Sequence, residues 1–346
     1  MSRHIKYRYD LLNKTNNKIG ELDCIDGTIN MKSDADIKYS GQFNIKENES
    51  KDVDYLNDRI RPVFIENGKE FYLPTFLISS PQRERKNNSI YRSITGYDLS
   101  QILLEDCFTE IYYIKEGTRY KDIITRIINS SGIYNVNILS SDDVIKRDRE
   151  IEIGKTKLEV VNELLKEINY TDVFVDKYGN ISAKPYILPN MRQVQHDYIL
   201  GQDANIVDSR IIDELDLYNI PNIFVAVVSN PEMDPLVAKF INDKASNELS
   251  TINRGRRIVK IENLNDITDK QVAEGYIRRI AYENTNIYRT VSFETLNDVS
   301  HGYADCVYLQ NDKLELNGKY IESEWQMRLK VGSTMSHTVQ KVELII

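Results

Sequence analysis

The chain has 346 residues, of which 41% are hydrophobic and 28% charged, and its formal net charge is −8. This balance is typical of a globular protein with ample buried cores, and the length suggests two or three domains. A net acidic chain disfavours a nucleic-acid binder, and no apolar run approaches the ~20 residues of a membrane span.

The N-terminal residues Met1–Lys6 lack the apolar core of a signal peptide, so we expect the chain to be made and folded in the cytosol. Three cysteines, Cys24, Cys107 and Cys306, lie far apart in strand-like contexts. We predict that they are buried free thiols.

The first part, residues 1–114, is predicted to consist of strands. Apolar and polar side chains alternate through Asp23–Met31 and Ile37–Ile45, which is the period of a half-buried strand. Asn67-Gly68 predicts a tight hairpin turn. Three further strands are predicted: Arg59–Glu66, Glu70–Ser79 and Ser89–Tyr97. Strands at such short spacing are typical of a small barrel or sandwich.

Three connections complete this first part. Pro81–Asn88 predicts a turn, and Asp98–Asp106 predicts a short helix that leaves the barrel. The charged segment Lys46–Asp58 predicts a solvated loop, with a loop that meets a neighbouring subunit as the alternative.

The middle part, residues 115–188, is predicted to be a module of two helices and a hairpin. Thr118 is a candidate N-cap for the first helix, and Gly132 suits the left-handed position after its end. Four isoleucines share one face of this helix: Ile123, Ile124, Ile127 and Ile128. The capping box Thr156–Glu159 opens the second helix. Four aliphatic residues form its predicted stripe: Leu158, Val161, Leu165 and Ile168.

A β-hairpin closes this module. Its strands are predicted at Tyr170–Asp176 and Ile181–Tyr186, joined by the turn Asp176–Asn180. Because helices this short are marginal alone in water, we expect both to cover one face of the hairpin. A structural module is the plain interpretation. A small peptidoglycan-binding module is the alternative, which no spaced aromatic cluster supports.

The last part, residues 189–346, returns to strands. Six are predicted: Asn222–Val228, Arg256–Glu262, Tyr288–Leu296, Ala304–Gln310, Ile321–Val331 and His337–Ile345. Leu316–Lys319 contains a second Asn-Gly hairpin signal, and Leu236–Ile241 fits helix or strand. We find no aligned internal repeat, so duplication of the first part stays a hypothesis.

One helix, at about 268–282, interrupts these strands. It is predicted to open on the capping box Thr268–Gln271, with Ile267 stapled onto Val272. Its mostly apolar face is formed by six residues: Val272, Ala273, Tyr276, Ile277, Arg279 and Ile280.

No motif of catalytic or cofactor chemistry is present. The chain lacks G-x-S-x-G, a P-loop, G-x-G-x-x-G and H-E-x-x-H, and Asp34–Asp36 lacks the glycine and distal glutamate of a calcium loop. Nothing in the spacing of His301, Cys306 and His337 requires a metal site. The four histidines fall on loops or strand ends, where surface placement is the default. Arg254–Arg257, the most basic cluster, lacks interleaved aromatics. We predict no catalytic, cofactor-binding or metal residues and no cofactor.

The order of the three parts resembles a known family. Six segments carry the resemblance: Glu116–Ile128, Lys155–Leu165, Val173–Pro185, Phe224–Pro231, Pro235–Ala238 and Leu249–Arg257. Together they resemble the central baseplate hub of contractile phage tails and phage-tail-like bacteriocins, in the form found in Gram-positive bacteria. The resemblance covers nearly the whole chain, and its specificity lies in the order of the motifs. It implies that Pro235–Ile241 is strand.

This resemblance implies a mainly β, α+β fold. Two tube-type β-barrel domains, 1–114 and 189–346, would flank the module at 115–188. It further implies a non-enzymatic homotrimer, whose six barrel domains continue the sixfold tail tube and whose far side matches the threefold central spike. The tape-measure protein and baseplate wedge proteins are further expected partners, without a membrane or sequence-specific nucleic acid.

The same resemblance implies where the chain is made and assembled, and it leaves alternative functions open. The chain would be made in the bacterial cytoplasm and assembled into the tail baseplate of a virion or bacteriocin, with the middle module at the periphery of the ring. An acidic or neutral channel is expected, since it would not trap DNA phosphates. A fused cell-wall hydrolase is not expected, because the sequence ends in a strand. The alternatives are a cell-wall hydrolase or peptidoglycan-binding tail module, and a hub of a non-contractile tail or secretion-system spike.

Overall fold

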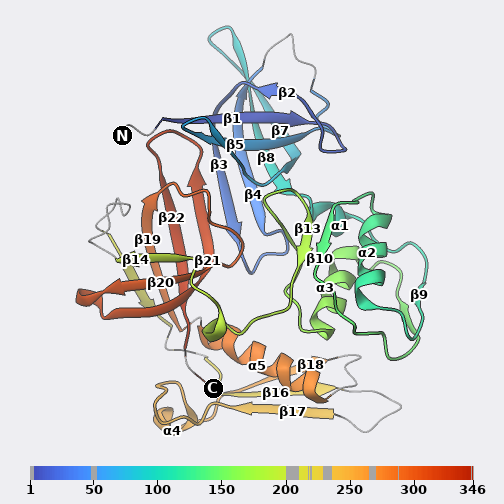
Figure 1. Ribbon diagram of the computed structural model, residues 1–346, viewed down its shortest axis with the longest axis vertical. Coiled ribbons are helices and arrows are strands. Elements are labelled where there is room, and N and C mark those ends of the chain that lie inside the picture. The colour runs from blue at the N-terminus through green and yellow to red at the C-terminus, as the bar shows by residue number, and fades with distance from the viewer. Residues whose placement is uncertain are drawn as a thin grey trace.

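The computed structural model describes residues 4–47, 53–199, 210–216, 218, 220–228, 236–264, 270–286, 288–343 and 345. In Figure 1, the first β part lies at the top, the middle module at the right, and the last strands below and to the left. A small sheet covered by one helix lies at the bottom. The predicted mainly β, α+β fold class is confirmed. None of the described helices is long and apolar enough to cross a membrane.

The first part contains eight strands. They are β1 (Ile5–Leu12), β2 (Lys18–Leu22), β3 (Cys24–Lys32), β4 (Tyr39–Lys46), β5 (Arg59–Glu66), β6 (Lys69–Tyr72), β7 (Phe76–Lys86) and β8 (Ser89–Asp98). The predicted Asn67-Gly68 turn joins β5 to β6, and both residues have the positive φ angles that a tight hairpin requires, 50° and 84°. Strands β1 and β2 were not predicted. In the charged segment Lys46–Asp58, residues 48–52 lie outside the described residues.

Two predictions in this part are wrong. The single strand expected at Glu70–Ser79 is two strands, because the chain leaves its pairing with β5 after Tyr72 and resumes pairing at Phe76. The turn expected at Pro81–Asn88 is confined to Asn87 and Asn88, and β7 continues to Lys86. A bulge between Ser79 and Gln82 accommodates Pro81, which has no amide hydrogen for a ladder bond.

The last part joins the first through a single sheet of 14 strands. The last part contributes β14 (His196–Ile199), β15 (Ile212–Leu215), β19 (Arg289–Leu296), β20 (Cys306–Asn311), β21 (Leu316–Arg328) and β22 (Thr334–Lys341) to this sheet. Strand β21 pairs antiparallel with β3, with Gln326 opposite Asn30. We call this β3–β21 pairing the seam. Figure 1 shows it where the blue strands descend beside the red ones.

One hydrophobic core spans the seam. It contains Phe43 and Met31 from the first part together with Trp325 and Met335 from the last. The Trp325 ring packs on Tyr39 with centroids 5.9 Å apart. The two β parts therefore share buried apolar surface as well as backbone hydrogen bonds.

The hairpin predicted at Leu316–Lys319 is wrong. These residues lie inside β21, and Gly318 pairs with Leu309 of β20 in extended backbone. The connection instead comes before them, as a short 3₁₀ turn at Asp312–Leu314 followed by Glu315 with a φ of 53°. Asn311 caps this turn by accepting from the Leu314 amide, so the Asn side chain upstream decides where the chain reverses.

A separate sheet of three strands forms the bottom of the molecule. It consists of β16 (Ile223–Val228), β17 (Leu236–Ile241) and β18 (Val259–Leu264), in the order β17–β16–β18. Helix α5 (Lys270–Asn286) covers one face through contacts that include Phe224, Ala238 and Ile277. Leu236–Ile241 is strand, as the resemblance implied. Thr268 and Ile267 of the predicted cap lie outside the described residues.

The predicted basic cluster lies at the end of a short helix. Arg254 ends α4 (Thr251–Arg254) and donates to the carbonyl of Ile220, and Gly255 follows in the left-handed conformation. The cluster therefore includes a helix terminus.

The middle module contains short strands and helices. They are α1 (Gln101–Glu105), β9 (Tyr112–Ile114), α2 (Tyr120–Ser130), β10 (Val136–Ile138), β11 (Arg149–Ile151), α3 (Lys157–Glu167), β12 (Phe174–Val175) and β13 (Ile181–Ala183). The predicted capping bond of Thr156 is confirmed, since its hydroxyl accepts from the Glu159 amide at 3.1 Å. Thr118 is not the N-cap of α2. That position is Arg119, whose side chain forms no capping bond.

This module is built from two copies of one β–α–β unit. Repeat 1, Asp106–Ile138, contains β9, α2 and β10, and repeat 2, Asp143–Val175, contains β11, α3 and β12. Each strand and helix start of repeat 2 lies 37 positions after its counterpart, apart from the first residue of β12. The buried helix faces match in pairs: Ile123 with Val160, Ile124 with Val161, Ile127 with Leu164 and Ile128 with Leu165.

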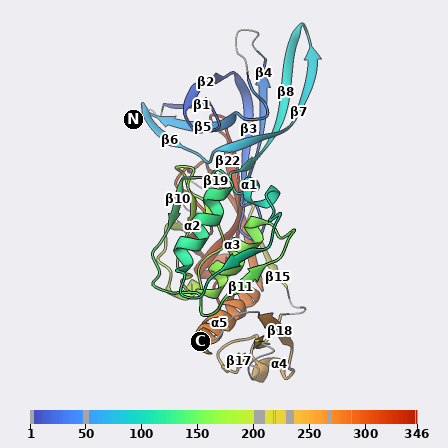
Figure 2. The same cartoon turned by 90° about the vertical axis from the view of Figure 1, so that its right-hand side faces the viewer.

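The two repeats exchange equivalent hydrogen bonds. The Gly117 amide donates to the Ile145 carbonyl, and its counterpart Gly154 donates to the Phe108 carbonyl, each at 2.8 Å. Tyr113 of β9 lies opposite its own counterpart, Glu150 of β11. The repeats are therefore related by a local twofold axis that passes through this pair. Figure 2 shows the helices α2 and α3 of this module facing the viewer.

Candidate functional site

Three of the four histidines meet in the last β part. His196 lies on β14, His301 in the loop between β19 and β20, and His337 on β22. The predicted surface placement is wrong for His301 and His337, which are both buried. Strand β14 adds parallel to β20 and the loop folds against it, so segments more than 100 residues apart bring their imidazoles together.

Glu322 of β21 joins two of these histidines. Its Oε2 lies 2.7 Å from Nδ1 of His301, and its Oε1 lies 2.5 Å from Nδ1 of His337. All three side chains are 0% exposed. The other ring nitrogens also have partners. The Tyr198 hydroxyl is 2.8 Å from Nε2 of His301, and Thr295 Oγ1 is 2.8 Å from Nε2 of His337.

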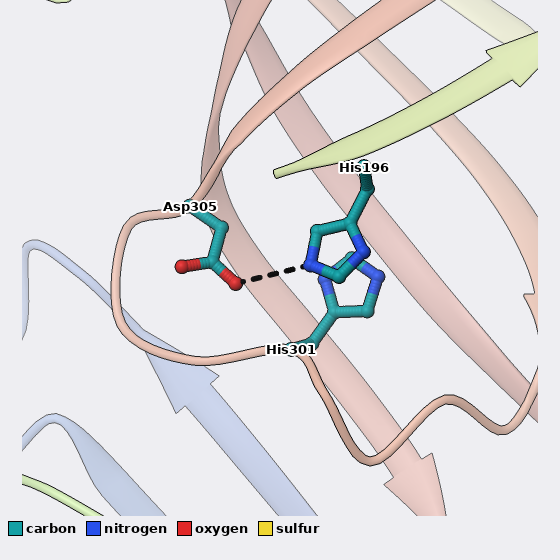
Figure 3. A group of neighbouring side chains, drawn as sticks. All are labelled: His196, His301 and Asp305. Carbon is teal, nitrogen blue, oxygen red and sulfur yellow. Dashed lines mark hydrogen bonds and ion pairs between the residues drawn. The ribbon is translucent and has the colours of Figure 1, made fainter. Parts of the chain in front are cut away.

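Figure 3 shows the other side of this group. The rings of His196 and His301 stack with centroids 3.7 Å apart and planes 11° from parallel. His196 Nε2 lies 3.3 Å from Asp305 Oδ2, which also accepts from the Gly302 amide. Asp305 Oδ1 accepts from Gln195, so this carboxylate ties β14 to the loop. We call His196, His301, Asp305, Glu322 and His337 the histidine cluster.

Burial and hydrogen bonding shift the pKa values of this cluster in opposite directions. Burial disfavours the ionised form of Glu322, but its hydrogen bonds with His301 and His337 outweigh burial and lower its pKa. Burial likewise disfavours charge on His301, yet the hydrogen bond with Glu322 raises the pKa of that imidazole. On His337 burial prevails and lowers the pKa. The cluster thus favours an ionised Glu322, a protonated His301 and a neutral His337.

The cluster contains the residue types that bind metals, in the sets His196–His301–Asp305 and His301–Glu322–His337. An imidazole lone pair lies in the plane of its ring, so two stacked parallel rings cannot both direct one at the same ion. Both nitrogens of His301 and of His337 are already hydrogen-bonded. The geometry is that of a buried hydrogen-bonded network. Cys306, grouped with His301 and His337 by the sequence analysis, belongs to neither set.

A cavity of about 730 Å³ opens where the three parts of the chain meet. Tyr303 and Ala304, from the loop that holds His301, form part of its wall, and Arg279 of α5 and Tyr186 of the middle module form others. Five cations line it: Lys38, Lys166, Lys184, Arg192 and Arg279. Three carboxylates do so as well: Asp34, Asp172 and Glu283. No sequence motif predicts this site, because its residues come from distant segments.

Comparisons with known proteins place the fold. No protein-family model matches the sequence, and no curated protein does. A tail protein from Neisseria meningitidis MC58 has a similar structure, with a TM-score of 0.68 at 12% identity over 97% of this chain and 96% of that one. The 43 kDa tail protein of prophage MuSo2 from Shewanella oneidensis has a TM-score of 0.68 at 12% identity, over 96% of this chain and 98% of that one. The chain therefore has a phage tail protein fold.

The likeness runs through all three parts of the chain. Prophage tail protein gp18 from Listeria monocytogenes EGD-e has a TM-score of 0.60 at 11% identity, over 96% of this chain and 94% of that one. Coverage this complete includes both β parts and the middle module. The resemblance to baseplate hub proteins, drawn from the order of motifs, is confirmed at the level of the fold.

Proposed function

We propose that this chain is a structural baseplate hub, which forms a homotrimeric ring between the sixfold tail tube and the threefold central spike. The observation that carries the proposal is the seam. It places two β parts of one chain side by side in one sheet, as neighbouring members of a larger ring would be. Three chains would then supply six such parts, which matches both symmetries.

The ends of this sheet support closure into a ring. Strands β15 and β2 terminate its main path and present unpaired edges within the described part of the chain. Exposed edges are surfaces on which strands of another chain can add. The tail tube protein on one face, the spike on the other, and the tape-measure and wedge proteins are the proposed partners. The role is non-enzymatic, and the three predicted domains are the proposed assembly units.

The oligomeric state tests this proposal. Light scattering of the purified chain should give three times the 40.2 kDa chain mass. A mixture with the tube and spike proteins of its own tail should give larger complexes that contain three copies of the chain. Negative-stain images should show a threefold ring with a central hole. A monomer under both conditions would overturn the proposal.

Zymography separates this role from that of a cell-wall hydrolase. The purified chain should leave a peptidoglycan gel intact, with lysozyme as the positive control. Clearing by the chain would contradict the structural role.

A further inference from the structure

The cavity at the junction of the three parts has an unusual charge distribution for an acidic chain. The net charge of the protein is −8, yet this cavity is lined by more cations than carboxylates. Arg279 accounts for much of the internal pairing. It contacts Glu283 at 2.8 Å and shares Asp172 with Lys38, with each cation 3.9 Å from that carboxylate.

Among the described residues, Lys166, Lys184 and Arg192 form no ion pair with a carboxylate. Arg192 donates through Nε to the Ile187 carbonyl and through Nη1 to the Ala304 carbonyl, so both of these bonds go to neutral acceptors and leave its charge uncompensated. Lys166 lies in the last turn of α3, where its charge also favours the helix C-terminus.

Aromatic rings hold several of these cations in place. The Arg192 and Arg279 guanidinium groups lie 5.2 and 4.5 Å from the centre of the Tyr186 ring. Lys184 Nζ lies 5.7 Å from the Phe174 ring, which stacks on Tyr303 at 4.8 Å. Cations held by ring contacts retain N–H groups that can donate to a carboxylate.

The size and lining of the cavity indicate its ligand. A volume of about 730 Å³ is in the range of sites for drug-sized organic ligands, and far exceeds a single inorganic anion. Apolar side chains, among them Ile187, Met191 and Ile280, line the same cavity as the charged ones. A ligand with both carboxylates and apolar groups, as in a short acidic peptide, fits this lining.

We propose that this cavity binds a short acidic peptide segment of a partner protein, with its carboxylates on Lys166, Lys184 and Arg192. The segment would contact the middle module and α5 at once, and so hold the module against the small sheet. The cavity lies within one chain, so binding of the segment would not depend on the proposed trimer.

Peptide selection tests the proposal. A random heptapeptide library is selected on the immobilised full-length protein, and the selected peptides should be enriched in Asp and Glu beside apolar residues. Binding of a selected peptide, measured by fluorescence anisotropy, should weaken about tenfold for each of Lys166→Glu and Lys184→Glu. Lys146→Glu is the matched control, since Lys146 is exposed on the same module outside the cavity, and it should bind unchanged.

Loss of peptide binding is interpreted only for variants that fold. Circular dichroism verifies that the variants fold, and Lys166→Gln with Lys184→Gln replaces the reversals where they do not. The proposal is overturned by a library without acidic enrichment, or by affinity that the cavity variants leave unchanged. It is also overturned if inorganic phosphate raises the melting temperature as much as the selected peptide and displaces it, because the cavity would then be a small-anion site.

Discussion

Glu322 is the residue on which the buried polar network of the last β part depends. Each of its oxygens is hydrogen-bonded to a different histidine, and each histidine is bonded again through its second nitrogen. Removing any member would leave polar groups of the others buried without a hydrogen-bond partner. This is costly, because a buried charge needs partners. The network therefore fixes how β14 and the loop before β20 lie on β21 and β22.

This network predicts a pH optimum of stability. His301 has a raised pKa, so its contribution is complete below its ordinary pKa of about 6.5 and is lost as the pH rises through the folded value. His337 has a lowered pKa, so stability falls as the pH drops below about 6.5, and the lowered pKa of Glu322 extends this loss further into acid. Melting temperatures should be highest near neutral pH and fall on both sides.

Glu322→Gln tests the assignment to this network. We expect a loss of about 3 kcal/mol in unfolding free energy, because the substitution leaves the paired imidazoles with one acceptor fewer. The decline on the alkaline side should also flatten, since His301 loses its charged partner. Glu324→Gln, an exposed position on the same strand, is the matched control. Equal pH profiles for Glu322→Gln and the unchanged protein would refute the role of this cluster.

The sequence could not have predicted the histidine cluster. His301 and His337 are on a loop and a strand, and their spacing carries no metal or catalytic signature. Their burial follows from the parallel addition of β14 to β20, a tertiary pairing that local pattern does not encode. The alternation around His337 does predict a strand, but alternation alone does not indicate which strand lies beside it.

The helices and strands of the middle module form a repeated β–α–β unit. Sequence patterns predicted both helices and the buried face of α2, yet missed the repeat. In the predicted stripe of α3, Ile168 instead follows the end of the helix and is only partly buried, and the buried Val160 and Leu164 were not predicted. Only four aligned positions are identical, namely Asp106 with Asp143, Ile114 with Ile151, Gly117 with Gly154 and Val136 with Val173. The shared features are physical, such as the left-handed residue after each helix, which is Gly132 in one repeat and Asn169 in the other.

The repeat provides a matched pair of helix caps. Thr156→Ala should lower stability by about 1 kcal/mol, because its hydroxyl caps α3. Arg119→Ala, at the equivalent position of α2, should change it little, since Arg119 makes no capping bond. Arg119→Thr should raise stability by about 0.5–1 kcal/mol by supplying the cap. Urea denaturation measures all three, and equal effects of the two alanine variants would contradict the cap assignment.

At the scale of the molecule, the seam makes the two β parts one folding unit. The sequence predicted most of their strands, from hairpin turns such as Asn67-Gly68 and from alternation. It gave no sign that β21 would pair with β3, which lies about 300 residues away. Such pairings depend on how the edges of two strands fit together, and the sequence pattern of one strand does not identify the strand that pairs with it.

The one tryptophan of the chain reports on the seam. Trp325 is 2% exposed and packs across the seam on Tyr39. We expect its fluorescence and the far-ultraviolet circular dichroism to change together in urea, because both β parts share one core. Trp325→Phe provides the blank for the fluorescence signal. A fluorescence change at clearly lower urea would show that the last part separates first.

The seam also changes how a ring would assemble. Six separate β domains would have to find one another by diffusion, whereas a chain that carries two already holds half of the contacts at a fixed local concentration. Only three bodies lose translational freedom on closure, which reduces the entropic cost of association. Covalent connection would also place the two kinds of β part side by side within every chain, so three of the six contacts in a ring would always join unlike parts.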